Sequence, residues 1–128
     1  MQKLKTFEDA CLALGIGATL PELENLPEKY RRGLLADYKL TVITEALNEG
    51  WQPDWSNGNE PKYQLWFDEK EAGSGLSFYV CVDRVSDTFV GSRLVYKSSE
   101  LAKYSAAQFP ELWADFINHQ NFNSNEKG

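Results

Sequence analysis

The spacing of apolar residues changes twice along this chain, and these two changes limit the folds that it can adopt. Before residue 50, apolar residues recur every three or four positions, as they do on one face of an α-helix. Between residues 62 and 97 they alternate with polar residues, as they do in half-buried β-strands. After residue 98 the helical spacing returns. A chain with helices at both ends and strands in the middle belongs to the α+β class.

The first part of the chain predicts two helices separated by a connector. Thr6 can cap a short helix, and Gly15 supplies its left-handed end. The connector over residues 16–26 contains glycine and proline. A long helix then runs from Pro27 to about Glu49. Because its apolar residues are spread too widely for a single stripe, we expect this helix to be central and covered on more than one side.

The middle of the chain predicts three strands, over residues 63–68, 76–83 and 92–97. The connections between them, 70–75 and 84–91, have lengths that suit an antiparallel meander. The strands are therefore expected to lie side by side in the order in which they follow one another in the sequence.

The last part predicts one helix that begins after Ser98 or Ser99. Pro110 interrupts it, because proline removes a backbone hydrogen bond and clashes with the carbonyl four residues before it. We therefore expect a kink or break over residues 108–110. The tail, residues 121–128, is expected to be frayed. The predicted fold is a single α+β domain over residues 1–120, with two N-terminal helices, a three-stranded antiparallel meander and a C-terminal helix, the helices packing on one face of the sheet.

Net charge and cysteine content limit the classes of partner that the protein can bind and indicate its cellular compartment. The net charge is −6 with a pI near 4.8. This argues against a general nucleic-acid binder and against an anionic membrane surface. No signal peptide is visible, and no run approaches the roughly 18 apolar residues of a membrane helix. Cys11 and Cys81 are far apart and read as reduced thiols, so we expect a cytoplasmic protein.

The residues that usually carry chemistry are sparse in this chain. His119 is the only histidine, and nothing in the spacing pairs it with a serine or cysteine nucleophile. One histidine and two isolated cysteines do not make a usual zinc site. The loop that begins at Asp54 fails as a calcium loop, because its glycine falls at position 5 and position 12 is Leu65. We therefore expect no catalytic residue, no metal and no cofactor.

The segment Gly50–Phe67 holds three of the four tryptophans and starts as a loop. Binding residues concentrate on loops, and tryptophan is frequent at interaction hot spots. The candidate interaction surface comprises Trp51, Trp55, Asn57, Asn59, Glu60 and Trp66. The alternative is that the aromatics hold the long helix to the first strand, and we expect this of at least two of the three tryptophans.

A second candidate surface lies on the predicted sheet. Tyr79, Arg93 and Lys97 could form a stacking platform for a small ligand or for single-stranded nucleic acid, or they could be ordinary solvent-facing positions. The favoured function is a small non-catalytic interaction or accessory domain that binds a protein or a second copy of itself. An open sheet edge offers a further docking surface. The alternative function is small-ligand or single-stranded nucleic-acid binding through the open sheet face.

Short motifs along nearly the whole chain resemble those of one family. They are Thr6-Phe-Glu-Asp-Ala-Cys-x-Ala-Leu-Gly, Leu26-Pro-Glu-Lys, Glu45-Ala-Leu-Asn-Glu-Gly-Trp-x-Pro-Asp-Trp, Lys62-Tyr-x-x-Trp-Phe, Gly91-Ser-Arg-Leu and Ser99-Glu-Leu-Ala. The combination resembles a set of small bacterial and prophage-like proteins without an established function. The resemblance implies a compact intracellular domain and no particular activity. Pro110 departs from the pattern of that family.

Overall fold

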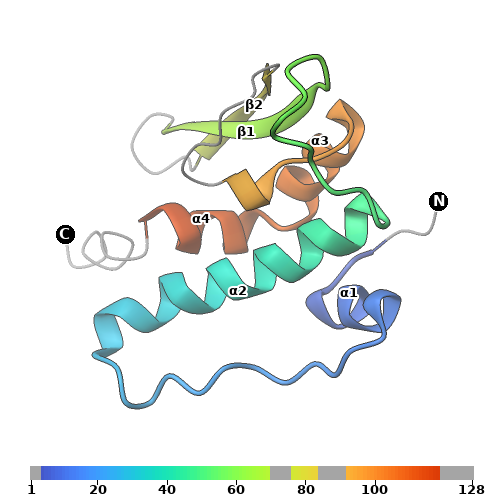
Figure 1. The fold of residues 1–128 in the computed structure, drawn as a ribbon. Coiled ribbons are helices and arrows are strands. Elements are labelled where there is room, and N and C mark those ends of the chain that lie inside the picture. Colours follow the sequence, from blue (N-terminus) through green and yellow to red (C-terminus); the bar gives the residue numbers. More distant parts are fainter. Residues whose placement is uncertain (1–3, 70–75, 84–91, 119–128) are drawn as a thin grey trace.

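The computed structural model describes residues 4–69, 76–83 and 92–118, and over these residues the protein has an α+β fold. The elements in chain order are α1 (Phe7–Leu14), α2 (Glu28–Asn48), β1 (Lys62–Glu69), β2 (Leu76–Asp83), the 3₁₀ helix η1 (Ser92–Leu94), α3 (Ser99–Gln108) and α4 (Pro110–Asn118). The β1–β2 hairpin lies at one end of the molecule, α3 and α4 lie under it, and α2 and then α1 follow (Figure 1). The helices therefore lie on one side of the hairpin, as the sequence predicted.

Helix α1 begins and ends where the sequence predicted. The Thr6 hydroxyl accepts a hydrogen bond from the Asp9 backbone N–H, and the Asp9 carboxylate accepts one from that of Thr6. This reciprocal pair is a capping box. Gly15 ends the helix with a φ of 72°, a left-handed conformation that glycine adopts without strain.

Helix α2 is central, and its C-terminal half is the more deeply buried. Leu40, Ile43 and Leu47 are buried in the core. Tyr30 and Leu34, in the first half, remain 40% and 45% exposed. Gly33 and Ala36 in the same turns are buried, so this half of the helix is covered over part of its surface.

The β1–β2 hairpin has one face in the core and one face away from it. The strands pair antiparallel from Lys62↔Asp83 to Glu69↔Leu76. The side chains of Tyr63, Leu65, Phe67 and Val80 pack against the core cluster. Because side chains alternate along a strand, Trp66 and its partner Tyr79 lie on the opposite, outer face.

The prediction of a third strand over residues 92–97 is wrong. Residues Ser92–Leu94 form η1, and only Tyr96 pairs with β1, through a single bridge to Tyr63. On the other side of this segment, the Asn48 amide of α2 donates to the Val95 carbonyl at 3.0 Å and accepts from the Lys97 N–H at 3.0 Å. The 3₁₀ conformation of Ser92–Leu94 takes this backbone out of the extended form that pairing with β1 needs. A side chain of α2 binds the backbone groups of the segment that face away from β1.

The predicted break in the C-terminal helix is confirmed. Helix α3 ends at Gln108, Phe109 caps it, and α4 begins at Pro110. Proline suits the first position of a helix, where the missing N–H would have had no helical partner. The two strand connections 70–75 and 84–91, His119 and the tail 121–128 lie outside the described residues.

A buried polar network joins the core side of the sheet to the helices. The Tyr96 hydroxyl lies 2.8 Å from the Thr44 hydroxyl and donates to the Ser105 hydroxyl at 2.8 Å. The Trp113 indole N–H also donates to Ser105, at 3.1 Å. Burial raises the pKa of Tyr96 to about 12, because the phenolate would be costly to desolvate.

None of the helices in the described part of the chain is long and apolar enough to cross a membrane.

Candidate functional site

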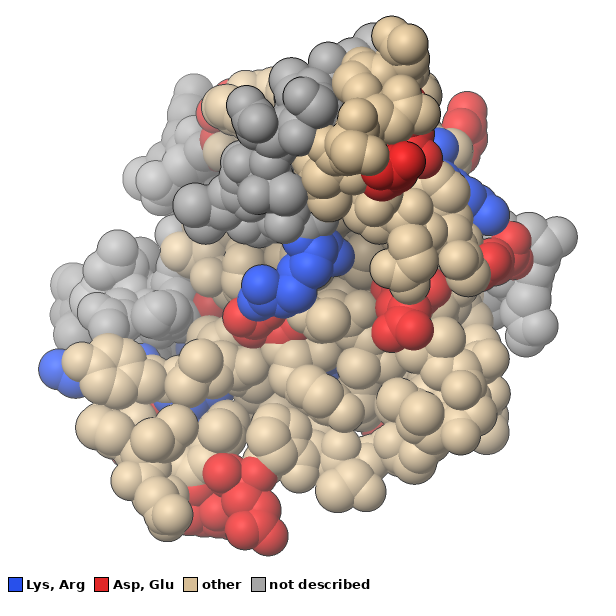
Figure 2. Space-filling view, viewed as in Figure 1, with Lys and Arg blue, Asp and Glu red and all other residues tan. Residues whose placement is uncertain are grey.

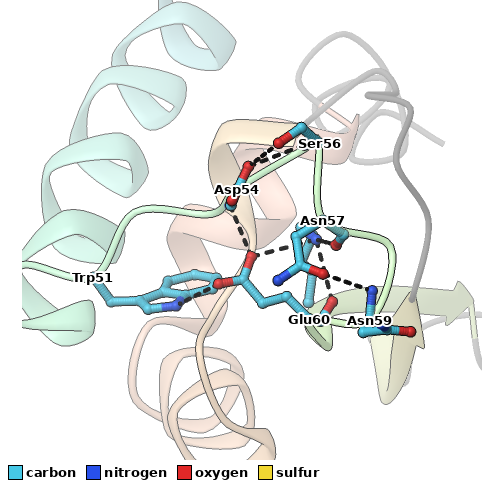
Figure 3. A network of polar contacts seen from close by, with 7 residues as sticks. Trp51, Asp54, Ser56, Asn57, Asn59 and Glu60 are labelled. Atoms are coloured by element: carbon cyan, nitrogen blue, oxygen red, sulfur yellow. Dashed lines mark hydrogen bonds and ion pairs between the residues drawn. The ribbon is translucent and has the colours of Figure 1, made fainter.

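The aromatic segment between α2 and β1 is organised by the carboxylate of Glu60. One oxygen of this carboxylate accepts from the Trp51 indole N–H at 3.2 Å, and the other accepts from the Asp54 backbone N–H at 2.7 Å. Figure 3 shows Glu60 between these two partners, with the Trp51 ring beside the end of α2. Glu60 therefore holds the start of the loop against its end.

Lys62, the first residue of β1, completes this arrangement from inside the protein. Its side chain is fully buried, and its ammonium donates to the carbonyls of Asn57 at 3.1 Å and Glu60 at 3.2 Å. The same nitrogen lies 3.3 Å from the Glu60 carboxylate and 5.0 Å from the centre of the Trp55 ring. A buried charge is costly unless it is paired and hydrogen-bonded, and this one is both. The sequence does not indicate that Lys62 is buried, because lysine is usually exposed.

The polar residues of the loop bind their own backbone. Asp54 accepts from the Ser56 hydroxyl at 2.6 Å and from the Ser56 N–H at 3.0 Å. These two hydrogen bonds hold the pKa of the Asp54 carboxyl below its usual range, and the bond from the Ser56 hydroxyl contributes most. Asn57 accepts from the Asn59 N–H at 3.0 Å. Such turns are the usual role of these residues in loops, and no metal-binding cluster is present among the described residues.

Trp51 and Trp55 are half-buried, and they form one wall of a hollow between the loop, α2 and η1. The hollow has a volume of about 380 Å³. Its lining includes Thr41, Glu45, Trp51, Gln52, Trp55 and Arg93. Two of the candidate tryptophans therefore face a shared cavity, and Trp66 does not contribute to it.

Trp66 lies on the outer face of the hairpin, where its only described ring contact is with Tyr79. The two rings are stacked across the strands, with centroids 6.3 Å apart and planes at 27°. Trp66 is 50% exposed and Tyr79 is 46% exposed. The structure thus brings together one residue from each of the two surfaces that the sequence offered as candidates.

Arg93 and Lys97 are engaged elsewhere. Arg93 Nη2 lies 2.6 Å and 2.8 Å from the two carboxylate oxygens of Asp37, and Arg93 Nε donates to the Thr41 hydroxyl at 3.2 Å. Lys97 Nζ lies 3.5 Å from the Glu49 carboxylate. Both cations are therefore paired with carboxylates at or beside α2. On the face seen in Figure 2, basic side chains are few and separated.

The two cysteines occupy different environments. Cys11 is buried in α1, and Cys81 is half-buried on the outer face of β2; both are free thiols.

A comparison of the chain with protein-family models, curated proteins and solved structures finds no match. The geometry of the aromatic segment and of the hairpin is therefore the basis for any inference about function.

Proposed function

We propose that the protein is a small non-catalytic interaction domain that binds a protein partner through the outer face of the β1–β2 hairpin. The observation that carries this proposal is the stacked pair of Trp66 and Tyr79, each about half exposed on the face away from the helices. Large aromatic side chains contribute much of the binding energy at protein interfaces when a partner covers them. Here their exposed faces have no role in the core.

The open edge of β2 supports the same surface. One edge of β1 is occupied by β2 and the other by the Tyr96 bridge, while no strand in the described part of the chain pairs with the far edge of β2. Strand β2 contains no proline or lysine, residues that commonly protect an edge. An extended segment of a partner could therefore add to β2 and contact Tyr79 at the same time.

A shallow hollow beside this edge offers a place for side chains of such a segment. It lies between β2 and α3, with a volume of about 400 Å³, and its lining includes Phe78, Val82 and Lys103. Phe78 and Val82 are 38% and 47% exposed. The apolar surface thus continues around the edge of the hairpin.

The experiment compares two variants that replace an exposed apolar residue on opposite sides of the molecule. Trp66→Ser changes the outer face of the hairpin, and Leu12→Ser changes α1, where Leu12 is 78% exposed. Both variants should keep a melting temperature close to that of the parent protein. The proposal expects the immobilised parent protein and Leu12→Ser to retain the same partner, and Trp66→Ser to lose it. Equal retention by all three proteins would contradict it.

Sedimentation velocity of the same three proteins tests whether the partner is a second copy of this chain. If the parent protein and Leu12→Ser are dimers and Trp66→Ser is a monomer, the outer face binds another copy of this chain.

Binding of single-stranded nucleic acid has less support, because Arg93 and Lys97 are already paired with Asp37 and Glu49. A fluorescently labelled oligonucleotide should therefore show no salt-sensitive binding.

A further inference from the structure

The hollow between α2, the aromatic loop and η1 is distinct from the outer face of the hairpin. Its volume of about 380 Å³ is sufficient for one small molecule, since ligand pockets range from about 300 to 1,000 Å³. Trp51 and Trp55 line it from the loop, Glu45 from α2 and Arg93 from η1. Aromatic walls with a few polar groups are the usual composition of a ligand pocket.

The walls of this hollow are held in place without a ligand. Glu60 fixes the Trp51 indole through its N–H at 3.2 Å, and the ammonium of Lys62 lies 5.0 Å from the centre of the Trp55 ring. Asp37 and Thr41 fix the guanidinium of Arg93. A ligand would therefore lose little affinity to the ordering of side chains.

The basic groups at and near the hollow offer little to an anionic ligand. Arg93 is neutralised by Asp37, and Lys62 is neutralised by Glu60. An anion would gain little from a guanidinium that is already paired. A quaternary ammonium suits an aromatic cage, but it has no hydrogen-bonding group to offer to Arg93, Glu45 or Gln52.

The hydrogen-bonding groups that remain are of both kinds. Within the described part of the chain, no residue binds Nη1 of Arg93 or the carboxylate of Glu45. Gln52, which is exposed at the rim, carries both a donor and an acceptor. A fitting ligand is therefore neutral, with hydroxyl groups around its edge and an apolar face for an indole ring.

We infer that this hollow binds one neutral pyranose sugar unit. The C–H groups on one face of a sugar ring carry partial positive charge and are attracted to the negative face of an aromatic ring. The ring stacks on Trp51 or Trp55, while its hydroxyls donate to Glu45 and accept from Arg93. Gln52 binds a hydroxyl at the rim.

The four tryptophans provide the readout, because each indole N–H gives one signal in a ¹H–¹⁵N correlation spectrum. The protein is titrated separately with glucose, N-acetylglucosamine, maltose and cellobiose, and with the linear polyol sorbitol as a control. The inference expects at least one sugar to shift the Trp51 or Trp55 signal saturably, with the Trp66 and Trp113 signals unmoved. Single Trp→Phe variants assign the signals.

A matched pair of variants then tests the polar side of the site. Glu45→Ala should weaken the sugar that binds by about tenfold, because it removes a charged hydrogen-bond acceptor. Glu22→Ala, at an exposed position in the connector, should leave the affinity unchanged. The inference is overturned if none of the sugars exceeds sorbitol, if choline shifts the Trp51 and Trp55 signals instead, or if Glu45→Ala binds like the parent protein. None of these outcomes bears on the outer face of the hairpin.

Discussion

Trp55 and Trp66 lie in one short aromatic segment, but they differ in burial and in the groups that contact their rings. Trp55 is half-buried, with the ammonium of the buried Lys62 5.0 Å from its ring centre. Trp66 is 50% exposed and, among the described residues, stacks on Tyr79. The loop aromatics Trp51 and Trp55 thus have charged partners that fix them, whereas the described ring contact of Trp66 is with another exposed aromatic.

This difference shows that aromatic content alone does not identify a binding surface. What separates the two regions is a buried polar node, defined here as Glu60 and Lys62 with the groups that they bind. Around the node, each polar contact restricts the position of an indole ring. On the outer face of the hairpin no such contact is described, so a partner could still cover the rings.

The largest expected effect comes from removing the centre of the polar node. Lys62→Met should lower the free energy of unfolding by about 3–5 kcal/mol, because it leaves the Glu60 carboxylate and two carbonyls without their buried cation. Urea denaturation followed by circular dichroism measures the change. Lys103→Met, at an exposed position on α3, is the control and should stay within about 0.5 kcal/mol of the parent protein. Equal effects of the two substitutions would show that the node does not organise the loop.

A second buried polar network, on the core side of the hairpin, should have an intermediate effect. Tyr96→Phe removes the hydroxyl shared with Thr44 and Ser105 and should cost about 1–3 kcal/mol of unfolding free energy. Ser105 would keep its bond from the Trp113 indole. Thermal and urea unfolding measure this loss. A change below the error of the measurement would mean that buried polar contacts do not distinguish the core side from the outer face.

The same tyrosine makes the stability depend on pH. Because burial raises the pKa of Tyr96 from 10.0 to about 12, the unfolded chain releases the phenolic proton first as the pH rises. The contribution of Tyr96 is therefore fully present below pH 10 and is lost as the pH rises toward about 12. The advantage of the parent protein over Tyr96→Phe should shrink across this interval. An advantage that is constant up to pH 12 would contradict the buried, neutral hydroxyl.

The smallest effect is expected where a polar contact is exposed. The Arg93 side chain is 56% exposed, so its pair with Asp37 is screened by water. Arg93→Ala should cost about 1 kcal/mol or less. A double-mutant cycle with Asp37→Ala measures the coupling of the pair. A coupling as large as the effect of Lys62→Met would show that burial does not decide the contribution of these polar groups.

The sequence predicted the parts of the fold that depend on local signals. The cap at Thr6, the left-handed end at Gly15 and the break at Pro110 each follow from a few neighbouring residues. The alternation in β1 and β2 likewise predicted the hairpin. These features need no information from distant parts of the chain.

The sequence could not predict features that depend on distant partners. The third strand fails because Ser92–Leu94 form η1, and because Asn48, 47 residues before Val95, holds the rest of the segment against α2. For the same reason, Arg93 was assigned to a strand beside Tyr79, while the structure directs it to Asp37 on α2. The burial of Lys62 could not be predicted either, because two of its acceptors are backbone carbonyls of a loop whose shape was unknown.

The sequence predicted only some of the contacts of the aromatic segment. The sequence identified it as the junction of the long helix and the first strand, and expected at least two tryptophans to be anchors. Trp51 and Trp55 have contacts that fit this role. The pairing of Trp66 with Tyr79 required the register of the hairpin, which the alternation alone does not give.

The most direct test of the difference between Trp55 and Trp66 compares Trp55→Ser with Trp66→Ser by urea denaturation. We predict that Trp55→Ser lowers the free energy of unfolding by about 2 kcal/mol, roughly half the cost of truncating a fully buried aromatic. We predict that Trp66→Ser lowers this energy by about 1 kcal/mol or less, the usual contribution of a cross-strand pair. If Trp66→Ser destabilises the protein as much as Trp55→Ser, the outer aromatics are part of the folded core, and the distinction between the two regions is wrong.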